Sequence, residues 1–283
     1  MGKLQKVQTN CLRRITGAYK RTPRVVLVKE ASIRPIDLYI RTASLKYGAA
    51  TKDNTVTKAI AQNLVYLGES INQKRRRLGL DRRKPTAMEL VRKEADLIIH
   101  EAQERNLNRD RPGRKRGEEE MKRGFILALN KWMSVIWQKR RANYKGNYSA
   151  ATWKTPWTHS TLKLYKGLKK HEATALMLLR SVIIGLNAWL SSIKIPNISP
   201  ACTCGEPFQT VKHILFFCPE HQTLRDQMLA KAGTTSFEKV LQTPKGCRAA
   251  SRMLIATDRL TQFAVANQIS IEKQVLVKIP VLD

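Results

Sequence analysis

The stretch of the chain that most constrains its fold is "CTCGEPFQTVKHILFFC", residues 202–218. It contains three of the five cysteines in the sequence and one of the five histidines. In chain order these are Cys202, Cys204, His213 and Cys218. Three thiolates and one imidazole form a closed tetrahedral ligand set that suits a structural zinc ion and leaves no open position for a substrate. The spacing therefore predicts one Zn²⁺ per chain, held in a small Cys3His module that resembles a zinc knuckle.

The local pattern supports this prediction and leaves two alternatives open. Gly205 follows the second cysteine and permits the tight turn that would bring two thiolates to one metal. The segment "TVKHILFFC" is typical of a short helix with His213 near its start and Cys218 near its end. One alternative is that the three cysteines are reduced and pack as small hydrophobic residues. In the other, His221 replaces one of the four ligands, although a histidine placed after a proline is more often solvated.

The charge of the chain indicates the kind of partner. It has 52 lysines and arginines against 22 aspartates and glutamates, a formal net charge of +30. Such a charge favours a polyanion, and nucleic acid is the first candidate. An anionic membrane is the second, but no apolar run reaches the ~18 residues of a spanning helix and no signal peptide is found.

The cysteine count and the basic runs bear on location. An odd number of cysteines without a secretory signal argues against a disulfide framework, so we expect a soluble, intracellular protein. Basic runs such as "KRRR" and "RKR" leave nuclear import open.

Apolar periodicity predicts a mainly α fold with few strands. A first helix should end at Gly17, and its apolar face predicts that Cys11 belongs to the core. That face consists of Leu4, Val7, Cys11, Leu12 and Ile15. A second short helix is expected over 25–31, and further helical pattern continues to about Leu67.

Two later helices have recognisable starts. A basic linker at 74–84 precedes a helix whose capping box is formed by Thr86 and Glu89. The next helix is expected to begin at Glu118, because three glutamates are favourable at a helix N-terminus. Its buried face is predicted to contain Phe125, Leu129, Trp132 and Ile136.

These patterns divide the chain into five segments. The predicted segments are a helical part at 1–68, a basic linker and helix at 69–117, a basic and aromatic-rich helical part at 118–199, the zinc module at 200–225 and a helical tail at 226–283.

Residues 121–180 are the most basic part of the chain, with thirteen lysines and arginines against one acid, and eight of the eighteen aromatic residues. Cations follow phosphates while aromatic rings stack on bases, so this pattern indicates a sequence-tolerant surface for single-stranded RNA or DNA. In the alternative interpretation, Trp132 and Ile136 are core residues of a helix whose other face is solvated. The residues predicted to contact nucleic acid are Lys139, Arg140, Arg141, Lys145, Tyr148, Trp153, Lys154, Trp157, Lys163, Lys166, Lys169 and Lys170.

Two stretches resemble the polyproteins of fungal non-LTR (LINE-like) retrotransposons. Residues 164–227 contain "LYKGL", a leucine-rich helix and "CTCGEPFQTVKHILFFCP", similar to the region after the RNase H domain, where LYxGL and CxCGxxxETxxHxLxxCP recur. The opening "LQKVQTNCLRRITGAYKRTP" with the later "SIRPIDL" resembles the segment after the reverse-transcriptase domain. The tail "SRMLIATDRLTQFAVANQ" is similar with less specificity. The resemblance implies a polyprotein that copies RNA into DNA, with the cysteine module holding the template or target strand.

The catalytic modules of such a polyprotein are not found in this sequence. In the family an RNase H domain lies between the two stretches, but residues 45–125 have no DGS-like strand. No two aspartates are adjacent, so the paired aspartates of a polymerase cannot be assigned. Gln209 replaces the usual Glu and Ser181 the usual Thr, both outside the ligand set.

We therefore predict a nucleic-acid-binding fragment that is not an enzyme. The alternatives are a protein-interaction or structural zinc module, and a non-functional relic of the element.

Overall fold

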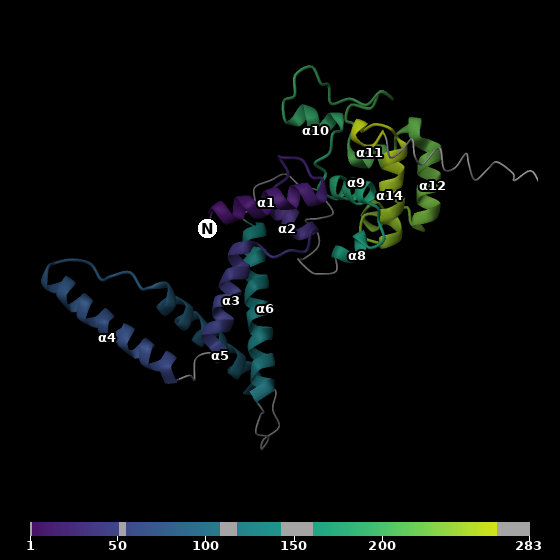
Figure 1. Cartoon of the computed structure of the whole chain (residues 1–283). Helices are drawn as coiled ribbons and strands as arrows, with labels where there is room; N and C mark the ends of the chain where they lie inside the picture. Colours follow the sequence, from purple (N-terminus) through teal and green to yellow (C-terminus); the bar gives the residue numbers. More distant parts are fainter. Residues whose placement is uncertain (1, 51–54, 108–117, 143–160, 265–283) are drawn as a thin grey trace, which may run out of the picture. The chain divides into compact units, whose positions relative to one another are not determined.

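The computed structural model describes residues 2–50, 55–107, 118–142 and 161–264, and the secondary structure in these ranges is entirely helical (Figure 1). This confirms the prediction of a mainly α fold. The chain divides into two compact units. One, here called the cluster unit, joins Met1–Arg34 to Tyr144–Asp283, and the inserted unit is Pro35–Asn143. The boundary at Arg34 falls inside the first predicted segment, 1–68. None of the described helices is long and apolar enough to cross a membrane.

The cluster unit is built from short helices drawn from both ends of the chain. Its helices are α1 (Gly2–Thr16), α2 (Arg24–Glu30), α8 (Thr161–Tyr165), α9 (Lys170–Ser181), α10 (Asn187–Ser192), α11 (Val211–Phe216), α12 (Gln222–Ala232), α13 (Phe237–Val240) and α14 (Pro244–Ala256). Two 3-10 turns are added at Pro219–His221 and Thr261–Phe263.

Helix α9 lies at the centre of the cluster unit. Every residue from Ala175 to Ser181 is buried, so the helix is enclosed on all sides rather than on one stripe. It packs against α14, which also packs against α12, and Figure 1 shows α12 and α14 side by side. The core continues into the cysteine segment through Val211, Ile214 and Leu215 of α11. The cysteine segment is therefore part of one hydrophobic core and not a separate knuckle on a tether.

A buried ion pair joins the first part of the cluster unit to the last. Arg180 donates two hydrogen bonds to the Glu30 carboxylate, at 2.7 and 3.1 Å, and the side chains are 2% and 0% exposed. The Tyr165 hydroxyl donates a third bond to Glu30 at 2.7 Å, and Arg180 also donates to the carbonyl oxygen of Leu241. Burial opposes the charge on the guanidinium, but the Glu30 carboxylate outweighs it and raises the pKa of Arg180. Helices α2, α8 and α9 are held together by this pair.

Helix α1 buries a different face from the one predicted. Cys11 is exposed, so its assignment to the core is wrong, and Leu4, Val7 and Ile15 are exposed with it. The physical reason is that α1 contacts α2 and α9 through a narrow strip, in which Thr9 and Leu12 are the buried residues. The predicted end of the helix is confirmed, because Gly17 has a φ of +69° and donates to the carbonyl of Arg13 at 2.9 Å.

The inserted unit contains four longer helices: α3 (Ile36–Ala50), α4 (Thr55–Arg77), α5 (Ala87–Leu107) and α6 (Glu118–Ala142). Helix α5 packs on both α3 and α6, and Leu45, Ile98 and Leu129 are central to their shared core. The predicted start of α6 at Glu118 is confirmed. On that helix Leu129 is buried, whereas Phe125 and Trp132 are partly buried against the core and Ile136 is also partly buried.

The linker before α5 differs in part from its prediction. Helix α4 continues to Arg77, so the first four residues of the predicted basic linker, 74–77, are helical. The capping box is confirmed, because Glu89 accepts from the Thr86 backbone N–H at 2.6 Å and donates its own N–H to the Thr86 hydroxyl at 3.3 Å. Arg83 adds an ion pair with the Glu89 carboxylate at 2.5 Å. The carboxylate of Glu89 therefore serves both the helix start and the preceding arginine.

Candidate metal centre

Two local features fix the backbone of the cysteine segment. The Cys202 carbonyl accepts from the Gly205 N–H at 3.1 Å, and Cys202 donates to the carbonyl of Glu206 at 2.8 Å, which closes a turn. Gly205 has a φ of +95°, a conformation that favours glycine, as the sequence predicted. At the other side, the Thr210 hydroxyl caps α11 by accepting from the His213 N–H at 3.1 Å. Turn and helix start thus present Cys204 and His213 to each other.

The predicted end of that helix is corrected. Helix α11 ends at Phe216, so Cys218 lies two residues beyond it instead of near its last turn. The Cys218 N–H donates to the carbonyl of His213 at 2.8 Å, and Arg225 donates to the Cys218 carbonyl at 2.9 Å. These two bonds fold the chain back so that Cys218 faces the turn that carries the first two cysteines.

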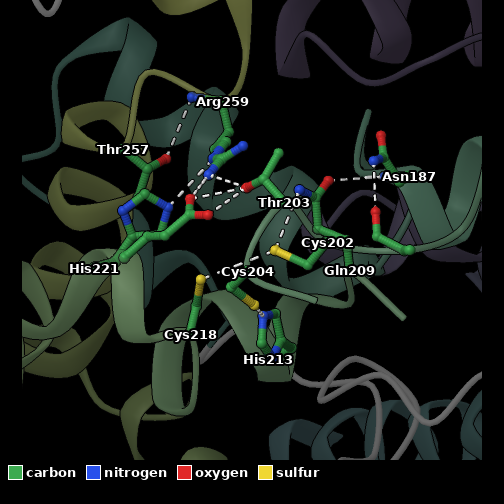
Figure 2. A network of polar contacts seen from close by, with 12 residues as sticks. Asn187, Cys202, Thr203, Cys204, Gln209, His213, Cys218, His221, Thr257 and Arg259 are labelled. Carbon is green, nitrogen blue, oxygen red and sulfur yellow. Dashed lines mark hydrogen bonds and ion pairs between the residues drawn. The ribbon is translucent and has the colours of Figure 1, made fainter. Parts of the chain in front are cut away.

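The four predicted ligands converge (Figure 2). Their ligand atoms all lie within 4.8 Å of one another. The sulfurs of Cys202 and Cys218 are 3.9 Å apart, and the Cys204 sulfur is 3.3 Å from Nε2 of His213. A disulfide would require about 2.05 Å, whereas two thiolates at ~2.3 Å from one tetrahedral metal lie about 3.8 Å apart. The spacing of the sulfurs thus fits a shared metal ion.

Burial and donor type agree with that fit. Cys202, His213 and Cys218 are buried and Cys204 is partly buried. A closed set of soft donors, shielded from water, could hold a metal ion in a structural role. In the alternative, reduced cysteines would fill the core and His213 would share a hydrogen bond with the Cys204 sulfur at the 3.3 Å seen here.

A second layer of polar contacts supports the cluster. Gln209 is buried, and its amide nitrogen donates to the Cys202 sulfur at 3.7 Å. Its amide oxygen accepts from the Asn187 N–H at 3.0 Å, while the Asn187 side chain donates to the carbonyl of Ala201 at 2.8 Å. Figure 2 shows this chain of contacts running from the cluster to α10. The sequence did not predict either role, because no spacing signal marks a glutamine as the donor to a cysteine sulfur or an asparagine as the partner of that glutamine.

The environment shifts the pKa values of Cys202 and Cys218 in opposite directions. Burial opposes ionisation of Cys202, but the Cys204 backbone N–H and the Gln209 amide outweigh it and lower the pKa of Cys202 to about 6. Burial and the neighbouring Cys202 sulfur raise the pKa of Cys218 to about 12. A cation among the four donors would be needed to keep both groups as thiolates at neutral pH.

His221 belongs to an adjoining polar network. It is buried, which contradicts the expectation of a solvated histidine, and Arg259 donates to its Nε2 at 3.3 Å. Arg259 also donates to the Thr203 hydroxyl at 2.7 Å and pairs with Glu220. Burial and the charge of Arg259 lower the pKa of His221. Donor atoms of Cys218, Glu220 and His221 also lie within 4.8 Å of one another, but that group has one soft sulfur donor where the Cys3His cluster has three.

The residues predicted to contact nucleic acid are divided among the cluster unit, the inserted unit and the ranges that the structure does not describe. Four of the predicted residues are exposed in the cluster unit: Lys163, Lys166, Lys169 and Lys170. In the inserted unit, Lys139 is exposed on α6; Arg140 and Arg141 belong to the same helix, but their side chains are outside the described part of the chain. The remaining residues lie outside the described ranges: Lys145, Tyr148, Trp153, Lys154 and Trp157.

The four exposed lysines at 163–170 belong to a larger basic patch. Arg248 of α14 donates to the carbonyl of Lys166 at 3.3 Å, which brings a fifth exposed cation beside them. We define the basic patch as Lys163, Lys166, Lys169, Lys170 and Arg248. Arg248 was not predicted, because only the packing of α14 against α8 and α9 places it there.

Neither a protein-family model, nor a curated protein, nor a solved structure matches this chain. The Cys3His cluster and the basic patch are the features of the described residues that bear on function.

Proposed function

We propose that this chain binds single-stranded RNA or DNA with little sequence preference, and that one structural Zn²⁺ stabilises the unit that does so. The observation that carries the proposal is the basic patch on α8, α9 and α14. The charge of the whole cluster unit supports the proposal, because its described ranges, 2–34 and 161–264, contain 23 lysines and arginines against seven acids. Such an imbalance attracts phosphates and supplies most of the affinity in sequence-tolerant binding.

The metal would be held by Cys202, Cys204, His213 and Cys218. Three sulfurs and one ring nitrogen favour zinc over harder cations that prefer oxygen ligands. The four protein ligands would fill a tetrahedral shell, so the ion would link the turn, α11 and the segment after it without activating a substrate. Ligand-binding free energy would then contribute directly to the stability of this segment.

The likeness to non-LTR retrotransposon polyproteins suggests an origin for such a chain. Within that proposal, the chain retains the cysteine module and the region after the polymerase, lacks polymerase and RNase H modules, and acts on nucleic acid in the nucleus. It would bind and not cut. Assays with Mg²⁺ or Mn²⁺ should detect no DNA synthesis and no cleavage of RNA–DNA hybrids. Turnover that a point substitution in this chain abolishes would contradict the proposal.

The binding proposal is tested by fluorescence anisotropy with a labelled single-stranded oligonucleotide at three salt concentrations. The logarithm of the affinity should fall with the logarithm of salt concentration by roughly 0.7 per phosphate neutralised. The variant Lys163→Gln/Lys166→Gln/Lys169→Gln should flatten this slope by about two. A control with the same change in charge alters Lys3, Lys6 and Lys231, which are exposed elsewhere. Equal slopes for the two variants would show that the basic patch is not the binding surface.

A second candidate function is a protein-interaction module. It is favoured by helix α4, on which Ile60, Leu67 and Ile71 are each about half exposed. In that case the attraction to oligonucleotides would vanish near physiological salt, because only unspecific charge would hold them. The same titration therefore separates the two functions.

A further inference from the structure

A pocket of about 920 Å³ lies beside the Cys3His cluster. Residues of α10, α11 and α13 line it, together with segments on either side of these helices. Its apolar lining includes Ile184, Trp189, Val211, Phe216, Phe217 and Phe237. Its polar and charged lining residues are Gln209, Thr210, Lys212, Thr235, Ser236 and Glu238. A pocket with a mostly apolar lining and several polar groups is the usual form of a ligand site.

Helix α11 separates the pocket from the cluster. His213 points at the cysteines, whereas its neighbours Lys212 and Val211 line the pocket. Gln209 belongs to both, because it lines the pocket and donates to the Cys202 sulfur. The contacts that position the metal ligands thus position one wall of the pocket as well.

The rings in the pocket are held in defined positions. Phe216 and Phe237 meet edge to face with centroids 5.5 Å apart. Trp189 stacks on Tyr19, with centroids 5.4 Å apart and planes inclined by 8°. These contacts orient Phe216, Phe237 and Trp189 in the lining of the pocket.

Phe217 differs from the other rings, because it is 61% exposed. The ammonium of Lys212 lies 5.6 Å from its ring centroid. Burial would ordinarily remove most of so large an apolar side chain from water, but the described residues leave more than half of its surface uncovered. An exposed ring beside a cation offers one group for a base and one for the adjoining phosphate.

We propose that this pocket takes an unpaired nucleobase of a single strand, with Phe217 stacking on the base and Lys212 contacting the neighbouring phosphate. The inference rests on the proposed function and adds a binding site to it. The net positive charge of the unit selects an anionic chain over an apolar peptide as the occupant. A duplex is disfavoured, because its bases are stacked on one another and leave no face for an aromatic ring.

The test compares three variants of the full chain in the anisotropy titration described above. Phe217→Ala should lower the affinity for a single-stranded oligonucleotide by roughly 5- to 150-fold without changing the salt slope. Phe217→Tyr should keep the affinity within about twofold, because the ring remains. The control is Phe208→Ala, since Phe208 is 59% exposed in the same segment but does not line the pocket. It should also leave the affinity unchanged.

A fourth variant and a crosslink test the geometry. Lys212→Gln should reduce the salt slope by about 0.7, one phosphate contact. An oligonucleotide that carries 5-bromouracil should crosslink under ultraviolet light to the peptide containing Phe216 and Phe217. Wild-type binding with equal effects of Phe217→Ala and Phe208→Ala would overturn the pocket assignment alone. A wild-type chain that does not bind at physiological salt would overturn the proposed function, and this inference with it.

Discussion

Single residues around the cluster decide where the ligand atoms meet. Thr210 sets the first turn of α11, and Gly205 supplies the positive φ that reverses the chain between two ligands. Gln209 then fixes the first sulfur through its amide. None of the three is a ligand, yet each positions a group that is. The cluster therefore depends on its neighbours as much as on its four donors.

Cys218→Ser is expected to release the metal, because a hydroxyl is a poor zinc ligand and three donors leave the tetrahedron open. The zinc content found by metal analysis should fall from about one Zn²⁺ per chain to nearly none. Limited proteolysis should then cut within 200–225, while the inserted unit stays protected. Cys11→Ser is the control, because Cys11 is exposed and lies outside the cluster. Full metal content in both variants would exclude Cys218 as a ligand.

Replacing only one partner of the buried pair Glu30–Arg180 should lower the free energy of unfolding strongly. Glu30→Gln leaves the guanidinium in the core without its counter-charge, and we expect a loss of about 3–5 kcal/mol in the free energy of unfolding, measured in urea. Replacing both residues by Met should cost less, because no buried charge remains. For comparison, Glu94→Gln removes a partly exposed pair with Arg41 and should cost at most about 1 kcal/mol. A similar small loss for Glu30→Gln would show that the pair is not buried in solution.

Residue-level prediction from the sequence succeeded where rare residue types cluster. Three cysteines and a histidine within seventeen residues identified the four converging side chains, because few other residues hold soft metals. It failed for Gln209, because no spacing signal marks its contact with the Cys202 sulfur, and for Arg248, which only packing brings to Lys166. It also failed for Cys11, because apolar spacing shows that a helix has an apolar face but not which neighbour covers it.

Among the helices, α9 links the parts of the cluster unit. Glu172 accepts from the Lys169 backbone N–H at 2.8 Å and so caps the start of the helix. The same carboxylate pairs with Arg252 of α14 at 2.7 Å. Helix starts of this kind were predictable from local signals, as at Thr86 and Glu118. The pairing of α9 with α14 was not, because the two helices are far apart in the sequence.

Glu172 gives the element-scale prediction. Burial opposes its charge, but Arg252 and the Lys169 N–H outweigh it and lower the pKa of Glu172. Its stabilisation should therefore be complete above its unfolded-state pKa of about 4.3 and be lost as the pH falls through the lower folded-state value. Glu172→Ala should cost about 1–2 kcal/mol at pH 7.

The control for that experiment is Glu206→Gln, because Glu206 is exposed. Thermal unfolding of both variants and the wild type at pH 7 and pH 3.5 measures the effect. The difference in unfolding temperature between Glu172→Ala and the wild type should be smaller at pH 3.5 than at pH 7. A larger difference at pH 3.5 would contradict a lowered pKa of Glu172 in the folded state.

At the scale of the molecule, charge is the dominant property. A formal charge of +30 opposes compaction, and binding a polyanion would relieve it. The two-unit division could not be predicted from composition, because both units are helical and basic. It follows from the contact of residues 1–34 with residues after 160, which no local pattern reveals.

The basic stretch at the end of α6 provides a molecule-wide prediction. Neutralising Lys139, Arg140 and Arg141 together should reduce the slope of log affinity against log salt concentration by the equivalent of about two to three phosphate contacts. Trp153→Ala should weaken binding by ~1–3 kcal/mol and leave the slope unchanged if its ring stacks on a base. Anisotropy titrations at three salt concentrations measure both. No response to either change would remove this stretch from the binding surface.

The ion pair between Glu30 and Arg180 spans 150 residues of sequence, and this sets an order of events during synthesis. At roughly 5–20 residues per second, Arg180 is made about 8–30 s after Glu30. For most of that time Val26, Leu27 and Val28, which end up almost fully buried, can pack on α1 but not on α8, which has not yet been made. Helices α3, α5 and α6 are made within the same interval and can pack first. The nascent chain is thus expected to present a partly uncovered apolar segment to chaperones until its last third has left the ribosome.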